Sequence, residues 1–440
     1  MSKRYSIRLP IHGFVEYDEW ERDIINHPVF QRLRRIRQLA FSDHVYPGAV
    51  HTRFEHSLGV MHVATRMFDA LYSKHKSILV GEFGYDEAKK ARAKALVRLT
   101  GLLHDVGHAP FSHTGEHLMP TQNSGKPFTH EDYSAFLIQE EMMDVINNHP
   151  ANRDRLHLTG KEIADFYLGR SSTSDLLLWR ELVNGQLDAD RMDYLLRDSH
   201  HCGVSYGRYD LDRIIDTLAL IEDSRDDSPA DVCIAIEKGG QHAAEGLILA
   251  RYFMFTQVYF HPVRIAYDHH AAQCLRSRLT TKKKPPATLP QPDSKAGRKH
   301  FLELDDWDMA SFIKKKKDNR DCDAILHHHH DRRVHRTPEV PSAGEIEGAG
   351  EILALLKEKS INAWMADSEK SWYKVGRTEI QIVDGSVVNN TLRKGKPLSE
   401  FSDVVGKIPG SNQRLVFVPH EQFENTRKII KESGLEEKPQ

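Results

Sequence analysis

Four side chains with the chemistry of metal ligands lie in three separate stretches of the chain. His56 lies in RFEHSLGV, His104 and Asp105 are adjacent in LLHDVGHAPFSH, and Asp190 lies in DADRMDYLLRD. Two imidazoles and two carboxylates suit a borderline divalent metal such as Mn, Fe, Co or Zn better than Ca²⁺ or a metal that prefers thiolates. A cation held in this way acidifies water and stabilises charge on a phosphoryl oxygen. The residue types therefore predict metal-assisted hydrolysis, provided that the four side chains meet in space.

Further titratable side chains follow the adjacent His-Asp pair. His108 and His113 come four and nine residues after His104, and Glu116 comes three residues after His113. On a helical turn this spacing lets Glu116 orient the imidazole of His113 and raise its pKa. An imidazolium beside a departing alkoxide is a good general acid. The alternative is that these histidines are structural and bond to the backbone.

Apolar residues at helical spacing predict the elements that position these side chains. We expect helices over residues 19–39 (broken at Pro28), 56–72, 85–103, 130–146, 188–197 and 241–279 (interrupted near 261–262). The four donors lie at or near the ends of three of these helices, and helical bundles build metal sites in their cores from ligands on several helices. Asp188 and Asp193 are expected to cap or pair on the helix surface.

The composition of the chain changes after about residue 280. Residues 281–343 contain KKKPPATLP, four consecutive lysines and four consecutive histidines, which indicates a basic, partly disordered insertion. Residues 344–440 are expected to form a smaller α+β region, with helices over 350–370 and 421–433 and strands at 380–383 and 414–418. Residues 1–280 are then the core, which includes one further strand at 232–236.

The bulk properties are those of a globular protein outside the membrane. The formal net charge is -2, so the chain has no global attraction for nucleic acid or anionic lipid, and any anion-binding surface must be local. The four cysteines show no CxxC spacing, which indicates a reducing compartment. No apolar run reaches the length of a membrane span. We therefore expect a cytoplasmic protein.

Three long motifs in a fixed order carry a family resemblance. RFEHSLGV, LLHDVGHAPFSH and DADRMDYLLRD resemble the HD-domain superfamily of metal-dependent phosphohydrolases over about residues 31–198. Within it they are most similar to deoxynucleoside triphosphate triphosphohydrolases, which include bacterial dGTPases and vertebrate enzymes with an added sterile-alpha-motif domain. That added domain has no counterpart here. The resemblance implies a mostly α-helical HD-domain bundle with a smaller α+β C-terminal region, and it implies His56, His104, Asp105 and Asp190 as ligands of Mn, Fe, Mg, Co or Zn.

The same resemblance implies catalytic roles for the side chains that follow the His-Asp pair. His113 is the expected general acid for the leaving 5′ oxygen, Glu116 its orienting partner and His108 a contact to the α-phosphate. His130, in FTHEDYS, corresponds to a histidine that lines the phosphate site, with Glu131 as its partner. The alternative for His130 is a structural role at the start of a helix.

Contacts to the substrate are also implied by the resemblance. Arg53 and Arg191 suit phosphate oxygens, which arginine binds bidentately. Tyr194 is expected to pack under the sugar where a 2′-hydroxyl would lie, and Asp198 to bond the 3′-hydroxyl, so a deoxyribose is preferred. The other expected contacts are Gln38 and Leu39 to the sugar and α-phosphate, and Tyr259, His261, Arg264 and Tyr267 to the base or γ-phosphate. The alternative for the tyrosines is ordinary core packing.

Regulation by a bound nucleotide is a further implication. Gln31 and Arg34 match family positions that read an activating guanine nucleotide between subunits, but Asn26 stands where those relatives have an Asp. Arg34, Arg35 and Arg37 form a basic cluster that holds activator phosphates or is simply an exposed helix face. We expect a homo-oligomer, from a dimer to a hexamer.

These observations predict a dGTPase-like dNTP triphosphohydrolase. It would release a deoxynucleoside and inorganic triphosphate, with dGTP as the favoured substrate, and serve dNTP pool control or defence against phage. The enzymatic alternative is an HD-type phosphodiesterase, nucleotidase or (p)ppGpp hydrolase. A different class is a regulatory module that binds nucleic acid through the basic insertion.

Overall fold

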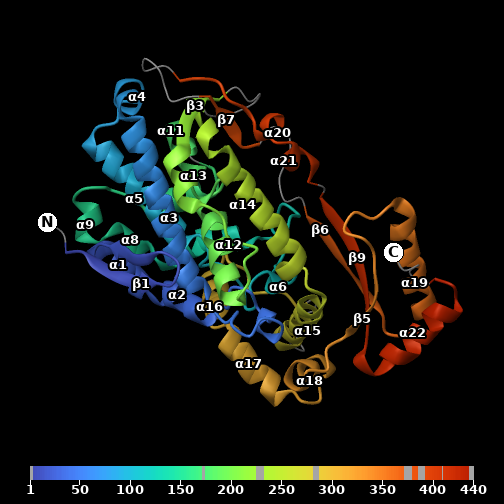
Figure 1. Ribbon diagram of the computed structural model, residues 1–440. Coiled ribbons are helices and arrows are strands. Elements are labelled where there is room, and N and C mark those ends of the chain that lie inside the picture. The colour runs from blue at the N-terminus through green and yellow to red at the C-terminus, as the bar shows by residue number, and fades with distance from the viewer. Residues whose placement is uncertain are drawn as a thin grey trace.

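The structure is a computed structural model that describes residues 3–170, 174–223, 232–280, 287–370, 379–384, 392–408 and 410–435. Over these residues the chain is mostly helical with three small β-sheets, which confirms the expected fold class. Figure 1 shows a large helical body and, beside it, a smaller unit of strands and helices formed by the C-terminal part of the chain. No helix of the described residues is both long enough and apolar enough to cross a membrane.

Most of the described residues lie in helices. These are α1 (Glu19–Asn26), α2 (Pro28–Gln31), α3 (Arg53–Lys74), α4 (Lys76–Gly81), α5 (Glu87–Leu103), α6 (His113–Glu116), α7 (His130–Phe136), α8 (Met143–Asn147), α9 (Pro150–Arg153), α10 (Gly160–Tyr167), α11 (Ser174–Arg180), α12 (Ala189–Cys202), α13 (Leu211–Thr217), α14 (Gln241–Met254), α15 (Pro262–Leu279), α16 (Lys295–Leu302), α17 (Asp306–Lys315), α18 (Arg320–His327), α19 (Ala343–Glu358), α20 (Leu398–Phe401), α21 (Asp403–Lys407) and α22 (Phe423–Glu432).

Helices α3 and α12 carry His56 and Asp190, and His104 and Asp105 directly follow the end of α5. α3 begins with a capping box between Thr52 and Glu55, and α12 is capped by Asp188, whose side chain accepts a hydrogen bond from the backbone N–H of Arg191. α12 packs against α3 at Gly59, where a Cβ would lie 1.9 Å from Asp193 Oδ1. Because no side chain fits in that space, Gly59 allows the close approach of the two helices.

Most of the predicted helices are confirmed, with shifted ends. Residues 56–72 lie in α3, residues 85–103 largely in α5, and Pro28 separates α1 from α2. The stretch 241–279 forms α14 and α15, joined through a π-helical turn at Phe255–Tyr259, and α15 begins at Pro262 as expected. A second π-helical turn, at Leu137–Glu141, interrupts the helix predicted over 130–146.

The helix predicted over 350–370 is wrong in its second half. α19 ends at Glu358, and Ser360 adopts a positive φ of 59°, which breaks the helical path. The chain then enters a strand, β6 (Trp364–Lys370). Trp364, the first residue of β6, still faces the helical body, since its ring stacks on that of His269 in α15 with centroids 4.0 Å apart.

The strands form three separate sheets. They are a hairpin of β1 (Tyr5–Leu9) and β2 (Gly13–Tyr17), a sheet in the order β3 (Leu218–Glu222), β4 (Val232–Glu237), β7 (Gln381–Val383) and β8 (Lys396–Pro397), and a sheet in the order β5 (Arg332–Arg336), β9 (Ser411–Val418) and β6. All pairs are antiparallel except β4 with β7. β4, β7 and β9 confirm the predicted strands, whereas β1, β2, β3, β5, β6 and β8 were not predicted as strands.

The tract predicted as a partly disordered insertion is ordered over its described residues. Residues 281–286 lie outside the described residues, but the remainder forms α16, α17, α18 and β5. Phe301, Leu304, Met309, Ile313 and Cys322 are buried in the main hydrophobic core. The sequence analysis did not predict these helices because the lysine and histidine runs, which are mostly exposed, mask apolar residues at helical spacing. The expected domain boundaries at 280 and 343 stay a prediction.

In the C-terminal unit, side chains pack on both faces of the β5–β9–β6 sheet. On one face, Ile352, Leu356, Val416, Val418 and Ile430 join the sheet to α19 and α22 in a small core. On the other face, Leu415 and Phe417 pack against Ala266 of α15. The unit is therefore attached to the helical body through α15, as Figure 1 shows.

Candidate metal centre and active site

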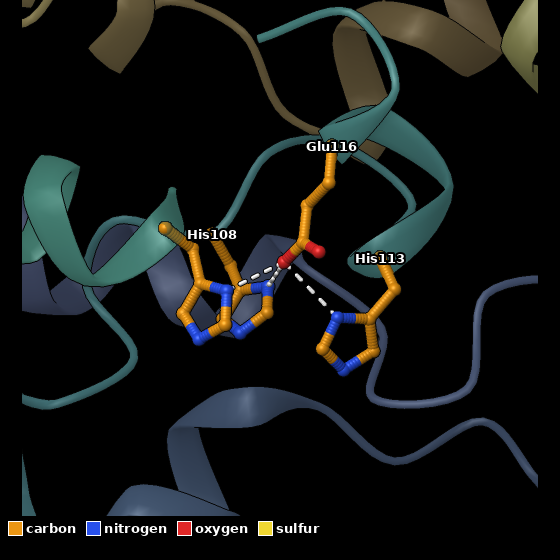
Figure 2. Close-up of side chains that lie close together, drawn as sticks. His108, His113 and Glu116 are labelled. Atoms are coloured by element: carbon orange, nitrogen blue, oxygen red, sulfur yellow. Dashed lines mark hydrogen bonds and ion pairs between the residues drawn. The ribbon is translucent and has the colours of Figure 1, made fainter. Parts of the chain in front are cut away.

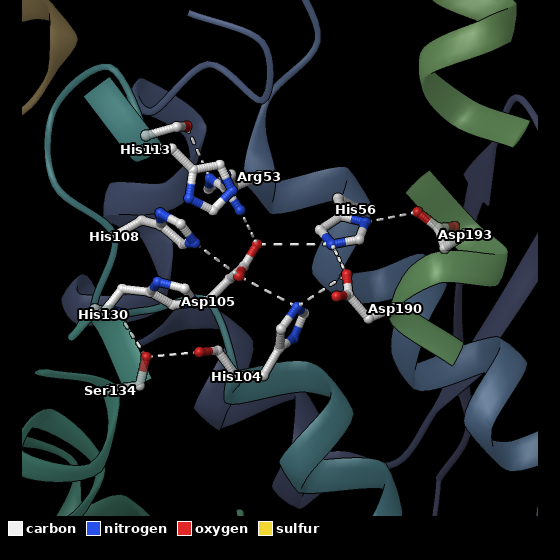
Figure 3. Close-up of polar contacts among 12 residues, drawn as sticks. Arg53, His56, His104, Asp105, His108, His113, His130, Ser134, Asp190 and Asp193 are labelled. Carbon is white, nitrogen blue, oxygen red and sulfur yellow. Dashed lines mark hydrogen bonds and ion pairs between the residues drawn. The ribbon is translucent and has the colours of Figure 1, made fainter. Parts of the chain in front are cut away.

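The four predicted ligands meet at one point between α3, α5 and α12 (Figure 3). His56 Nε2 lies 3.0 Å from Asp190 Oδ1 and 3.6 Å from Asp105 Oδ2. His104 Nε2 lies 3.7 Å from the same Asp190 oxygen and 3.2 Å from Asp105 Oδ1. These four residues are referred to below as the cage.

The donor atoms of the cage fit a divalent cation. The Nε2 atoms of His56 and His104 are buried and have no hydrogen-bond partner among the described residues. Their Nδ1 atoms are occupied, since that of His56 lies 2.8 Å from Asp193 and that of His104 lies 2.8 Å from the carbonyl oxygen of Gly101. A proton on Nδ1 leaves the Nε2 lone pair pointing into the cage, which is the arrangement of a metal-bound imidazole.

The charges around the cage favour a cation as well. Burial alone would lower the pKa of His56, but Asp190, Asp193 and Asp105 outweigh it and raise that pKa to about 10. Burial alone would raise the pKa of Asp105, but Arg53 and neighbouring imidazoles hold it well below its usual range. The pKa of Asp190 is also lowered, against burial, by His104 and His56. The carboxylates are therefore ionised and available as ligands.

Asp193 supports the cage from behind, and its place differs from the surface position that was expected. It is fully buried, and besides His56 it contacts His12 Nε2 at 2.6 Å and accepts two hydrogen bonds of 2.8 Å from Arg197. Asp188 caps α12 as expected, but it is also buried and does not lie on the surface. Sequence reasoning missed His12, which comes from the loop of the N-terminal hairpin, because only the tertiary fold brings it to α12.

A second group of side chains lies beside the cage and centres on Glu116 (Figure 2). One oxygen of Glu116, Oε1, lies 3.0 Å from His113 Nδ1, 2.5 Å from His130 Nδ1 and 3.9 Å from His108 Nδ1. The rings of His108 and His130 stack with centroids 4.1 Å apart. The expected pairing of His113 with Glu116 is therefore present, whereas Glu131 lies further from His130, at 3.5 Å.

Burial and charge give the members of this second group different protonation states. Burial tends to raise the pKa of Glu116, but His113 and His130 lower it far below its usual value. Burial tends to lower the pKa of His130, but Glu116 raises it. Burial, Arg53 and His130 hold the pKa of His108 well below its usual value, so His108 is neutral. The group also has the donor types of a cation site, yet Glu116 already bonds two imidazoles.

The arginines expected to bind phosphate are both engaged within the chain. Arg53 is buried and donates to Asp105 Oδ2 at 2.6 Å and to Ser112 Oγ at 2.9 Å. Arg191 donates to Asp188 Oδ2 at 2.7 Å and to the carbonyl oxygen of Gly185. Their roles as phosphate ligands stay predictions.

The expected sugar contacts lie close to one another. Asp198 is buried, with Oδ1 2.8 Å from His51 Nε2 and Oδ2 accepting a hydrogen bond of 2.6 Å from the hydroxyl of Tyr259. The rings of Tyr194 and Tyr259 meet edge to face with centroids 6.2 Å apart. Tyr259 was expected to contact the base or γ-phosphate. It instead donates a hydrogen bond to Asp198, the residue that was expected to bind the 3′-hydroxyl. His51 was missed because it stands outside the three motifs.

The remaining expected contacts are distributed around these groups. Gln38 and Leu39 are buried, and Gln38 Oε1 has no hydrogen-bond partner among the described residues. Arg264 donates to the carbonyl oxygen of Tyr259. Tyr267 is buried against the ring of His44, with centroids 4.1 Å apart, which favours the alternative of core packing for this residue.

The region expected to read an activator is largely self-paired. Arg34 donates to Gln31 Oε1 at 2.9 Å, and Gln31 donates to the carbonyl oxygen of Ile25 at 2.7 Å. Arg35 pairs with Asp305 at 2.5 Å and Arg37 with Asp43 at 2.7 Å. Carboxylates therefore neutralise Arg35 and Arg37, whereas the described partner of the Arg34 guanidinium is the neutral amide of Gln31.

Comparisons with known proteins agree with this geometry. Residues 53–198 match the HD domain, and residues 209–337 match the HD associated region. The first match contains the whole cage, and the second includes α16, α17 and α18.

Whole-chain similarities extend these matches. The deoxynucleoside triphosphate triphosphohydrolase SAMHD1 of Bos taurus is 30% identical over 334 residues, which cover 69% of this chain and 51% of that protein, so the match spans about half its length. The crystal structure of a hypothetical protein from Aquifex aeolicus superposes with a TM-score of 0.75 at 29% identity, covering 97% of this chain and 99% of the other. A phosphohydrolase from Bacteroides thetaiotaomicron superposes with a TM-score of 0.69 at 25% identity, covering 95% of this chain and 100% of the other. The cage, the matched domain and these relatives place the chain in the HD-domain phosphohydrolase family.

Proposed function

We propose that this protein is a metal-dependent dNTP triphosphohydrolase that cleaves a dNTP into a deoxynucleoside and inorganic triphosphate. The observation that carries the proposal is the contact between the cage and the second group. His108 Nε2 lies 3.2 Å from Asp105 Oδ1, while its Nδ1 faces Glu116. One phosphate can therefore lie next to both groups. The bovine relative is named for this activity, and dGTP is our favoured substrate.

The cage supplies the metal chemistry of the proposed reaction. A cation such as Mn, Fe, Mg, Co or Zn, held by His56, His104, Asp105 and Asp190, would acidify water and polarise a phosphoryl oxygen. Asp193 fixes the ring of His56 from behind, which keeps its Nε2 directed into the cage. Water then attacks the α-phosphorus while the bond to the 5′ oxygen breaks.

His113 is the proposed general acid for the leaving 5′ oxygen. Its side chain is 62% exposed, so a substrate can reach it, and Glu116 bonds its Nδ1. That bond leaves Nε2 as the atom that delivers the proton. Glu116 is ionised and accepts from the Nδ1 side of the ring, which orients His113 toward the substrate.

Arginines near the cage are proposed to neutralise the triphosphate. Arg53 lies against Asp105, and Arg191 lies next to Asp190 on α12. Arg251 joins them, because it lines the same small pocket as Arg191 and its Nε is buried without a hydrogen-bond partner among the described residues. Sequence reasoning did not select Arg251, since a single arginine in an aromatic helix carries no distinguishing pattern.

Tyr194 and Asp198 are proposed to select the deoxyribose. They lie four residues apart on α12, so they are on the same helix face. A phenol ring at the 2′ carbon excludes a hydroxyl sterically, and a carboxylate accepts a hydrogen bond from the 3′-hydroxyl. Because Asp198 bonds Tyr259 and His51, the sugar would share or displace those partners.

Regulation and cellular role extend the proposal. We expect a homo-oligomer in which Gln31 and Arg34 contact an activating nucleotide, and a use in dNTP pool control or defence against phage. Binding the activator would require Arg34 to give up its bond to Gln31.

The test is product analysis with each dNTP alone and in pairs. Purified protein is incubated with Mn²⁺, and the phosphate products are separated by ion-exchange chromatography. The proposal predicts intact triphosphate and deoxynucleoside. Release of monophosphate or pyrophosphate instead indicates an HD-type phosphodiesterase or nucleotidase, and no turnover with any pair contradicts an enzymatic role for the cage. Turnover only with a second nucleotide identifies an activator.

A further inference from the structure

The loop that carries His108 and His113 has an unfavourable backbone conformation. Between α5 and α6, Phe111 and Ser112 have positive φ values of 60° and 57°. Residues with a Cβ rarely adopt such angles, and strained segments of this kind persist only where surrounding contacts hold them. The position of both histidines therefore depends on what holds the loop.

Two buried side chains hold the loop from outside the cage. Asp306 Oδ1 accepts a hydrogen bond of 2.8 Å from the backbone N–H of Phe111, and Asp306 Oδ2 accepts another of 2.8 Å from the backbone N–H of Arg37. Arg32 donates to the carbonyl oxygen of His108 at 2.9 Å. Its other nitrogens donate to the carbonyl oxygen of Leu304 at 3.0 and 2.6 Å. The loop is thus fixed at both ends to residues 304–306.

The neighbouring carboxylate, Asp305, makes a different set of contacts. Its side chain caps α17 by accepting from the backbone N–H groups of Trp307 and Asp308 at 3.0 Å, and it pairs with Arg35. Asp305 has no described contact with the loop. Of the two adjacent aspartates, Asp305 therefore caps α17 and Asp306 supports the loop.

We propose that Asp306, assisted by Arg32, is a positioning residue that holds the His108–His113 loop in its active conformation. The segment 304–306 belongs to the HD associated region, so that region supports the His108–His113 loop of the active site. The inference rests on the proposed function only where hydrolysis is the readout. Its central content, that Asp306 is needed to hold the loop, does not depend on the substrate.

The test compares Asp306→Ala, Asp306→Asn and the matched control Asp305→Ala in the full chain. Hydrogen–deuterium exchange of peptides covering residues 104–116 reports the loop, and metal analysis reports the cage. We expect faster exchange in that segment for Asp306→Ala but not for Asp305→Ala, with an unchanged metal content in all three. Asp306→Asn keeps one acceptor oxygen and the same shape, so it should fold and show a smaller increase.

Hydrolysis of dNTPs with Mn²⁺ gives a second readout. For Asp306→Ala we expect kcat to fall by about 100-fold with little change in KM, since a misplaced acid slows the chemical step more than binding. Asp306→Asn should recover part of kcat. Equal exchange in the Asp306 and Asp305 variants, or a full kcat in Asp306→Ala, overturns the inference. If the wild-type protein hydrolyses no dNTP, the proposed function fails, but the exchange comparison still decides the role of Asp306.

Discussion

The cage and the His108–His113 loop share one site but are fixed in different ways. The cage residues are held by the ends of α3, α5 and α12, and three of the four side chains are almost fully buried. The loop has positive φ angles at Phe111 and Ser112, presents an exposed His113, and depends on Asp306, which lies 195 residues away from Phe111 in the chain. Helix packing thus positions the proposed metal ligands, whereas a distant contact supports the loop that carries the proposed general acid.

Removing a cage ligand should have the largest effect. Asp190→Ala deletes the carboxylate that both Nε2 atoms face, so cation binding and charge stabilisation are lost together. We expect kcat/KM for dNTP hydrolysis to fall by more than about 1000-fold, which corresponds to several kcal/mol of transition-state stabilisation. The control is Asp212→Ala, which removes an exposed carboxylate on α13 and should be neutral. Activity retained by Asp190→Ala would show that the cage is not catalytic.

Removing the proposed general acid should lower activity without affecting metal binding by the cage. His113→Gln should lower kcat by about 100- to 1000-fold, because protonation of the leaving oxygen is lost, and leave the metal content unchanged. His117→Gln changes an exposed histidine four residues on and is the matched control. A loss of metal in His113→Gln would assign this histidine to a cation site instead.

The pH dependence of stability should reveal the buried Asp306. Burial raises the pKa of Asp306 to about 6, even though Phe111, Arg37 and Arg32 oppose this shift. Because the pKa of Asp306 is higher in the folded state than in the unfolded state, its protonated carboxyl contributes to the free energy of unfolding at pH values below about 4. This contribution is lost as the pH rises from about 4 to about 6. The loss is about 3 kcal/mol for a shift of this size. Urea unfolding at pH 4.5 and 7 should therefore show the wild type losing more stability than Asp306→Asn; parallel losses would argue against the shift.

Weakening the support of the cage should have a smaller effect than removing a ligand. Asp193→Asn keeps the shape of the side chain but removes the charge that orients His56 and Arg197. We expect metal affinity to fall by about 10- to 100-fold, measured by competition with a chelator. An unchanged affinity would mean that helix packing alone orients His56.

The sequence predicted the cage residues more completely than the residues that hold the cage and the His108–His113 loop in place. His56, His104, Asp105 and Asp190 were identifiable because ligand chemistry is written in the residue types and in three motifs. The pairing of His113 with Glu116 followed from a spacing of three residues on one helical turn. These are local patterns, and a single sequence displays them directly.

The supports were missed because they depend on tertiary contacts. Asp306 lies in a stretch whose lysine and histidine runs resemble disorder, although its apolar residues are buried. Asp193 follows Asp190 by three residues, which is equally compatible with an exposed position, and only the packing of α12 at Gly59 buries it. His12 and His51 lie outside the motifs, so no pattern in the sequence connects them to α12.

Metal stoichiometry tests the central claim most directly, because the second group also has cation-binding donor types. Elemental analysis of protein saturated with Mn²⁺ and freed of excess metal should find one cation per chain. That cation should be lost in Asp190→Ala and retained in Glu116→Gln. Two cations per chain, or one that disappears in Glu116→Gln and survives in Asp190→Ala, would contradict the account.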